Sequence, residues 1–266
     1  MNIVTSANHD FAHCLASLIG SIHQHYGQRP IVYDLGLTPE DRQSMDAVFV
    51  DFPVAAATFG FVTKGGHQFV RATHKAGCIQ DYWRRHDEPM MFVDADCLFR
   101  ARVEEKGFDV GVTLRTRGLD VSDPFNGVLN SGVLIFNDPA PELLGRWAEQ
   151  CLIGETTDQK ALVEVLSETI DWSAYDRVYD WHGLKVKVFR TDDINDYHLR
   201  TGRIWHFKGV RHAVAIHRQL LAAIQAGKDP FAVYKRMHRR QRRSDLWRRL
   251  FGRRGGGRDN GSPTGT

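Results

Sequence analysis

The chain has 266 residues, of which 42% are apolar and 25% are charged. At about 150 residues per domain, this length predicts one large domain or two small ones, with enough chain to bury a core. The composition excludes collagen-like, coiled-coil and wholly disordered proteins, and no apolar run reaches the roughly 18–20 residues of a membrane-spanning helix.

The N-terminus and the cysteines indicate a cytosolic protein. The segment MNIVTSANHDF has no basic stretch and no long apolar run, so we expect no secretory signal. The four cysteines include no C-x-x-C pair, which argues against a disulfide framework and a zinc knuckle. They are scattered at Cys14, Cys78, Cys97 and Cys151.

The formal net charge of +3 conceals an asymmetry. Residues 235–266 hold eleven Lys and Arg residues against two acids, so the rest of the chain is mildly acidic. We expect the basic segment to bind an anionic partner that differs from the partner of the body.

Strands alternate with helices along the chain, which predicts an α/β fold with a mainly parallel sheet. Thr38 and Pro39 form a strong helix start, as N-cap and first helical residue. Apolar runs predict strands at residues 2–6, 30–34, 47–52, 89–94, 109–114 and 132–136; helical spacing predicts helices at 11–26, 68–83, 141–151 and 159–166. Ligands of such sheets bind beyond the carboxyl ends of the strands.

Asp94 and Asp96 form a D-x-D motif directly after an apolar strand. Two neighbouring carboxylates are costly unless a cation joins them, and hard oxygen ligands suit Mg²⁺ or Mn²⁺. A solvated turn is an equally good interpretation of the pair alone. Phosphatases with Asp94 as nucleophile are a third, which Leu98 disfavours because those enzymes usually carry Thr or Val there.

Three later segments add polar residues. NSGVLIFN begins with Asn130 and Ser131 and runs into a strand, TDQ contains Asp158 and Gln159, and WHFKG contains His206. Thr157 by itself is a helix N-cap, and Asp158 and Gln159 are suited to sugar hydroxyls.

The motifs FVDAD, NSGVLIFN, TDQ and WHFKG occur in an order that resembles the glycosyltransferases of family 8. The resemblance covers about residues 2–212 and implies a GT-A fold, a nucleotide-sugar donor (UDP being the expected nucleotide) and retention of anomeric configuration. It implies that Asp94, Asp96 and His206 hold Mn²⁺ or Mg²⁺, and that Asp158 and Gln159 flank the reacting centre. The residues implied to contact the nucleotide-sugar are Thr5, Ala7, Asn8, Asp10, Arg71, Lys75, Ala95, Asn130, Ser131, Lys208 and Gly209.

Two departures from the family concern the phosphate contact. The family often has Lys six residues after the metal-binding His, followed by Pro-Trp, whereas this chain has His212 and no Pro-Trp. Lys208 or Arg211 are the candidates to replace that contact.

The composition of the C-terminal residues predicts that they lie outside the main domain. We expect a glycosyltransferase domain at 1–234, a basic amphipathic segment at 235–254 and a disordered tail at 255–266. A helix starting at Ser244 would place Leu246, Trp247, Leu250 and Phe251 on one face and arginines on the other, which is typical of a helix on an anionic membrane. A solvated tail is the plain alternative, and nucleic acid is disfavoured because no nucleic-acid module is evident.

The resulting prediction is a metal-dependent hexosyltransferase that lies on the inner face of the membrane. Its acceptor is expected to be a lipid-linked or cell-envelope glycan. A metal-dependent phosphohydrolase and a non-catalytic nucleotide-sugar-binding protein are the alternatives.

Overall fold

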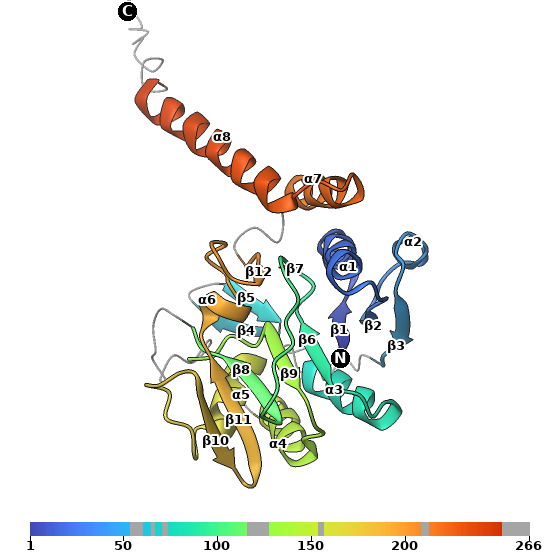
Figure 1. The fold of residues 1–266 in the computed structure, drawn as a ribbon, viewed down its shortest axis with the longest axis vertical. Coiled ribbons are helices and arrows are strands. Elements are labelled where there is room, and N and C mark those ends of the chain that lie inside the picture. The colour runs from blue at the N-terminus through green and yellow to red at the C-terminus, as the bar shows by residue number, and fades with distance from the viewer. Residues whose placement is uncertain are drawn as a thin grey trace, which may run out of the picture.

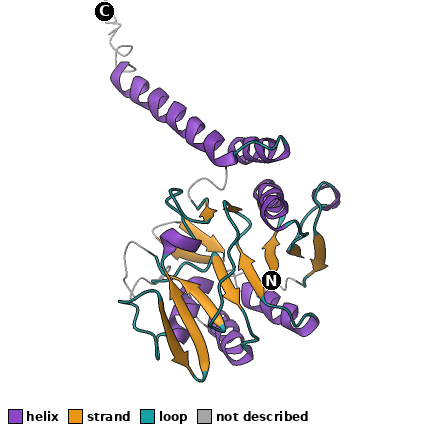
Figure 2. Ribbon diagram, viewed as in Figure 1, coloured by secondary structure: helices purple, strands orange, loops and turns teal. Residues whose placement is uncertain are grey.

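A computed structural model of the chain describes residues 1–53, 61–64, 67–70, 74–115, 128–153, 157–208 and 213–251. Within them, an eight-stranded sheet forms the centre of the molecule, with helices packed on it (Figures 1 and 2). Its strand order is β10(Arg177–Trp181), β11(Leu184–Phe189), β8(Val110–Thr113), β9(Val133–Phe136), β6(Met90–Val93), β1(Asn2–Ala7), β2(Ile31–Asp34) and β3(Val48–Asp51).

The sheet is mixed, with a parallel half. β3, β2, β1 and β6 are parallel neighbours, as are β8 and β11. β9 is antiparallel to both β6 and β8, and β10 is antiparallel to β11. The apolar runs predicted six of the eight strands of this sheet and missed β10 and β11. The strand directions depend on connections that periodicity does not encode.

The central strands β6, β8 and β9 are buried on both faces, which explains their continuous apolar sequences. Alternate residues of β6 point to opposite faces: Met90 and Phe92 join one cluster, Met91 and Val93 another. The first cluster packs on α3(His74–Arg85), α4(Pro141–Ile153) and α5(Asp158–Leu166), and the second on α1(Ala12–Tyr26). The sheet is therefore the middle layer of three.

Two helix starts differ from the prediction. The helix expected at 68–83 begins at His74, because His67–Val70 forms strand β5 with β4(Phe61–Lys64). The helix expected from Ser244 belongs to one helix, α8(Pro230–Phe251). Asp229 accepts from the backbone N–H of Phe231 at 2.9 Å, so the cap lies 15 residues earlier in the chain. By contrast, Thr38 caps α2(Pro39–Gln43) as predicted, in a capping box with Asp41.

A small ribbon and two C-terminal helices complete the structure. β7(Cys97–Phe99) and β12(Ile204–His206) pair antiparallel outside the main sheet. β12 follows the short helix α6(Thr191–Ile194) and a polar loop. A short 3-10 helix, η1(His9–Phe11), precedes α1. α7(Val214–Gln225) packs on α1, and α8 projects away from the sheet (Figure 1). Among the described residues, none of the helices combines the length and the apolar character that a membrane span requires.

Candidate metal and donor site

The acid pair lies where the sheet rule predicts, just beyond the carboxyl end of β6. The backbone N–H of Asp94 donates to the carbonyl of Gly132 at 2.8 Å. This bond continues the antiparallel ladder that joins Val93 to Val133. The D-x-D turn and the N-S-G turn before β9 are therefore held side by side, although Asp94 and Gly132 are 38 positions apart in the sequence.

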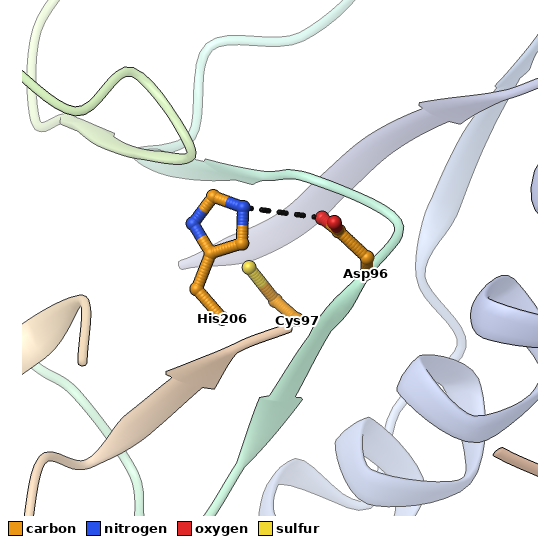
Figure 3. Close-up of side chains that lie close together, drawn as sticks. All are labelled: Asp96, Cys97 and His206. Carbon is orange, nitrogen blue, oxygen red and sulfur yellow. Dashed lines mark ion pairs between the residues drawn. The ribbon is translucent and has the colours of Figure 1, made fainter. Parts of the chain in front are cut away.

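His206 reaches the acid pair through the β7–β12 ribbon. Its backbone lies opposite Cys97, one residue after Asp96. The Nε2 atom lies 3.2 Å from Oδ1 of Asp96 and 3.7 Å from Oδ2 of Asp94. Figure 3 shows the ring of His206 directed at the Asp96 carboxylate. The three predicted metal ligands thus converge, although they come from distant segments.

The other ring nitrogen of His206 is held by a residue that the sequence did not single out. Nδ1 lies 3.1 Å from Oδ1 of Asn195, and the Asn195 amide nitrogen donates to the carbonyl of Asn130 at 3.3 Å. Because an amide oxygen only accepts, this contact places a proton on Nδ1, so Nε2 is the ring nitrogen left to coordinate a cation between the carboxylates. That is the tautomer a metal ligand requires.

Asp196 supports the loop that leads to His206. Its buried carboxylate accepts from four backbone N–H groups at 2.7–3.0 Å, those of His198, Arg200, Thr201 and Gly202. Its backbone carbonyl accepts from the N–H of His206 at 3.1 Å. Asn195 and Asp196 belong to none of the sequence motifs, and only their position shortly before the strand that ends in His206 could have marked them.

Gly132 makes room for the site. A Cβ at this position would lie 2.2 Å from Cε1 and 2.4 Å from Nδ1 of His206, and 3.0 Å from Oδ2 of Asp94. Real Cβ atoms do not approach so closely, so only glycine allows His206 and Asp94 to face each other here.

The convergent side chains fit a divalent cation. Asp96, Cys97 and His206 offer ligand atoms within 4.8 Å of one another, and Asp94 Oδ2 faces the same imidazole nitrogen. Burial raises the pKa of Cys97 well above its usual range, and its Sγ lies 3.7 Å from the carbonyl of Gly132. A protonated thiol is a poor ligand for a hard ion, so Asp94, Asp96 and His206 are the better set for Mn²⁺ or Mg²⁺.

Beside this set, Lys75 and Asp158 form a buried charge network. The Lys75 ammonium, on α3, lies 2.9 Å from Oδ1 of Asp94 and 3.1 Å from Oδ2 of Asp158. It also donates to the carbonyl and hydroxyl oxygens of Ser131 at 3.0 and 3.2 Å. Lys75 is 4% exposed. Its ammonium is therefore committed to protein acceptors.

The network keeps its members charged. Burial by itself lowers the pKa of Lys75, but the charges of Asp158 and Asp94 outweigh it and raise the pKa. Burial likewise raises the pKa of Asp158, but the charge and hydrogen bond of Lys75 lower it overall. Asp158 is therefore an ionised carboxylate. Because it is buried away from water, its negative charge interacts strongly with neighbouring charges.

The start of α5 positions both TDQ side chains. Thr157 caps the helix, accepting from the N–H of Lys160 at 3.2 Å, as the sequence predicted. Asp158 accepts from the Ser131 hydroxyl at 2.9 Å, and Gln159 accepts from the Ser131 N–H at 3.2 Å. The N-S-G turn therefore docks on α5. The buried amide nitrogen of Asn130 has no hydrogen-bond partner among the described residues.

The residues expected near the nucleotide lie at the end of β1. Ala7 pairs with Asp34, and Asn8 and Asp10 follow with partly open and exposed side chains. The Thr5 hydroxyl is buried without a hydrogen-bond partner in the described structure. Ala95 packs in a small cluster with Ala7, so β1 and the D-x-D turn adjoin.

Of the three remaining predicted residues, Lys208 alone is among the described residues. Lys208, two residues after His206, has an exposed side chain, and the charges of Asp94, Asp96 and Asp158 act on its ammonium. Arg71 and Gly209 lie outside the described residues, as do Arg211 and His212.

Comparison with known proteins identifies the fold. No protein-family model and no curated protein sequence matches the chain. Among solved structures it is similar to the apo bifunctional glycosyltransferase WbbM, with a TM-score of 0.50 and 14% identity over 79% of this chain. The match spans 46% of the WbbM chain, so this chain covers less than half of that protein.

Two other solved structures are similar. One is the galactosyltransferase LgtC in complex with donor and acceptor sugar analogues, at 18% identity over 82% of each chain and a TM-score of 0.44. The other is a glycosyltransferase involved in glycosylation of the major capsid of PBCV-1, at 11% identity over 81% of this chain and 97% of that chain, with a TM-score of 0.48. The likeness to WbbM shows that the chain has this α/β fold, and the expected GT-A fold is confirmed.

Proposed function

We propose that this protein is a metal-dependent hexosyltransferase that uses a nucleotide-diphosphate sugar, with UDP as the expected nucleotide. The convergence of Asp94, Asp96 and His206 beside the ion pair of Lys75 and Asp158 carries the proposal. Two features support it: the solved structures of similar fold bear the names of glycosyltransferases, and this site lies at the sheet edge where α/β proteins bind ligands.

Asp94, Asp96 and His206 would hold Mn²⁺ or Mg²⁺. A bound divalent ion supplies Lewis-acid stabilisation of the negative charge that develops on a departing diphosphate. His206 is prepared for this role by Asn195, which keeps the Nδ1 proton in place. Gly132 keeps the space between His206 and Asp94 open.

Asp158 and Gln159 would flank the donor sugar. The transition state of glycosyl transfer carries positive charge at the anomeric carbon, and a buried carboxylate stabilises such charge. Lys75 fixes the ionised state and the orientation of Asp158 through Oδ2. The Asn130 amide nitrogen, buried without a partner in the described structure, offers a donor for a sugar or phosphate oxygen. Retention of configuration follows from the family resemblance.

The direct test is release of nucleoside diphosphate from a panel of nucleotide-sugars with Mn²⁺. Wild type is compared with Asp96→Asn, which keeps the shape of the side chain but removes its charge. We expect slow hydrolysis of one donor, abolished by the substitution and by a chelator. A donor identified in this way would then be used in an acceptor search among glycans and lipid-linked glycans.

Other outcomes decide between the alternatives. Stabilisation of the fold by a nucleotide without turnover, even with acceptors present, would indicate a binding protein. Phosphate release from simple esters without a nucleotide would indicate a phosphohydrolase with Asp94 as nucleophile. In the structure Asp94 Oδ1 is held by Lys75, which leaves Oδ2 for such a role.

We also propose that α8 attaches the enzyme to an anionic membrane surface. Its described part presents an open surface pocket lined by Ala232, Lys235, Arg236, Arg239 and Arg240. Lys235, Arg236, Arg239 and Arg240 are exposed and lie on the helix that projects from the body (Figure 1). Each cation near an anionic membrane contributes about 1 kcal/mol. The side chains of Leu246, Trp247, Leu250 and Phe251, predicted to form the apolar face, lie outside the described part of the structure.

A further inference from the structure

The β7–β12 ribbon, which carries His206 and follows Asp96, has two different faces. Successive residues of a strand point to opposite sides. Cys97, Phe99 and Ile204 pack in the cluster shared with the main sheet, the side on which His206 meets the carboxylates. The opposite face belongs to a separate cluster, whose buried members are Leu98, Trp205, Phe207, Leu220, Phe231 and Tyr234.

The outer face of the ribbon is covered by the C-terminal helices. The Trp205 ring lies edge-on to Phe231 of α8, with ring centroids 4.6 Å apart, and 5.5 Å from Tyr234. Phe207 lies 5.5 Å from Tyr234 and 5.3 Å from His217 of α7. The aromatic rings of α8 therefore contact both sequence neighbours of His206.

The ribbon depends on packing for its stability, against the main-sheet cluster and α1 on one face and against the C-terminal helices on the other. Each strand has three residues, and an isolated two-stranded ribbon of this kind is marginally stable in water. A backbone hydrogen bond from Phe207 to the carbonyl of Asp96, 2.9 Å, joins its two ligand-bearing ends. Arg100 lies over the rings of Trp205 and Phe231, at 5.5 and 5.1 Å, and closes the cluster from outside.

We propose that Phe231 and Tyr234 of α8 are positioning residues for His206, acting through Trp205 and Phe207. This inference rests on the proposed metal site. With Trp205 and Phe207 held on either side, the direction of the His206 side chain is set by the packing of two rings that lie 25 and 28 positions later in the chain. The first turns of α8 thus belong to the metal site, while its cationic continuation from Lys235 faces outward.

Direct binding of Mn²⁺, measured by calorimetry on the full chain, tests the proposal. We expect Tyr234→Ala to weaken Mn²⁺ binding by about ten-fold or more, the range seen when groups that orient metal ligands are removed. Tyr234→Phe keeps the ring and should bind within two-fold of wild type. Tyr179→Ala, the same truncation at the edge strand β10, controls for a general loss of stability and should leave Mn²⁺ affinity unchanged.

A second readout needs no metal. The ring nitrogen shifts of ¹⁵N-labelled histidine report the tautomer of His206, and its signal is assigned with His206→Gln. Wild type and Tyr234→Phe should show protonation at Nδ1, as the contact with Asn195 requires, whereas Tyr234→Leu should show mixed tautomers. Tyr234→Leu retains apolar volume and serves where the alanine variant does not fold.

The outcomes separate this inference from the proposed function. If wild type binds Mn²⁺ no better than Asp96→Asn, the metal site itself is wrong. If Asp96→Asn abolishes binding but Tyr234→Ala and Tyr234→Leu keep the wild-type affinity and His206 spectrum, the positioning role is overturned and the metal site stands.

Discussion

His206 and Gly132 face each other so closely that a Cβ on the glycine would lie 2.2 Å from Cε1 of the imidazole. The two residues are 74 positions apart, and no local turn geometry requires glycine at this position, because its φ lies outside the left-handed region. The glycine is required by the approach of a second segment.

Gly132→Ala tests this relationship. The methyl group would displace His206 or Asp94, so we expect Mn²⁺ affinity and donor hydrolysis to fall at least ten-fold. Gly145→Ala is the matched control, since a Cβ there meets nothing within 4 Å and the residue lies within α4. Replacing that helical glycine should stabilise the protein by about 0.5–1 kcal/mol. Equal activity of both variants would contradict the proposed geometry.

Asn195 is predicted to set the tautomer of His206. Asn195→Ala removes the acceptor of the Nδ1 proton, and we expect metal affinity to fall by roughly ten- to a hundred-fold. Asn195→Asp restores an acceptor and should recover most of that loss. Calorimetric titration with Mn²⁺ measures both variants, and an alanine variant with wild-type affinity would show that Asn195 does not position the ring.

Lys75 is predicted to matter for stability as well as for the site. Lys75→Met leaves Asp94 and Asp158 without their shared cation, and removing one partner of a buried ion pair costs about 3–5 kcal/mol. Urea unfolding at pH 7 measures this loss. Lys185→Met, at an exposed position of β11, should change the free energy of unfolding by no more than about 0.5 kcal/mol.

Lys75→Met should also change how the free energy of unfolding depends on pH. Lys75 lowers the pKa of Asp158 in the folded protein, so this stabilisation is present above the unfolded pKa and is lost as the pH falls through the folded one. Without Lys75 the buried carboxylate favours its protonated form. The difference in the free energy of unfolding between wild type and Lys75→Met should therefore shrink as the pH is lowered from 7 to 4.

His217 is predicted to destabilise the fold in mild acid. Burial lowers its pKa to about 4, and its Nδ1 contacts the Ser17 hydroxyl at 3.0 Å, joining α7 to α1. Because the unfolded chain takes up this proton near pH 6.5, stability is present above that pH. It is lost as the pH falls toward 4, by on the order of 3 kcal/mol.

Unfolding curves of His217→Gln measured from pH 4 to 7.5 check this prediction. The variant should be less stable than wild type at pH 7.5 yet lose less stability on acidification. His74, whose pKa burial also lowers to about 4, should keep part of the pH dependence. If the stability of His217→Gln depends on pH as steeply as that of wild type, His217 is not the source of the acid sensitivity.

The cationic face of α8 predicts binding to anionic vesicles. Arg236→Glu with Arg239→Glu should reduce sedimentation with vesicles containing phosphatidylglycerol, and wild-type binding should weaken as salt screens the charges. Arg177→Glu with Lys185→Glu reverses the same number of charges on the exposed β10–β11 pair and should bind as wild type does. Equal loss in both would indicate that net charge alone is responsible.

The features that depend on neighbouring residues could be predicted from the sequence by itself. Apolar runs predicted the strands of the main sheet except β10 and β11, and Thr38 and Pro39 predicted the start of α2, because these patterns depend on neighbouring residues. The D-x-D motif was predicted at a ligand-binding edge for the same reason: Met90–Val93 is apolar, and two acids follow it. Resemblance to a known family then suggested which distant side chains to combine.

Only the tertiary structure decided how those side chains meet. Lys75 was expected to contact the nucleotide-sugar, and the packing of α3 on the sheet decides that its ammonium lies between Asp94 and Asp158. Asn195 became a partner of His206 because a loop closes on Asp196, and α8 reached the site because its rings cover Trp205 and Phe207. Such contacts join segments tens of residues apart, and they form only when the burial of apolar surface fixes the path of the chain between them.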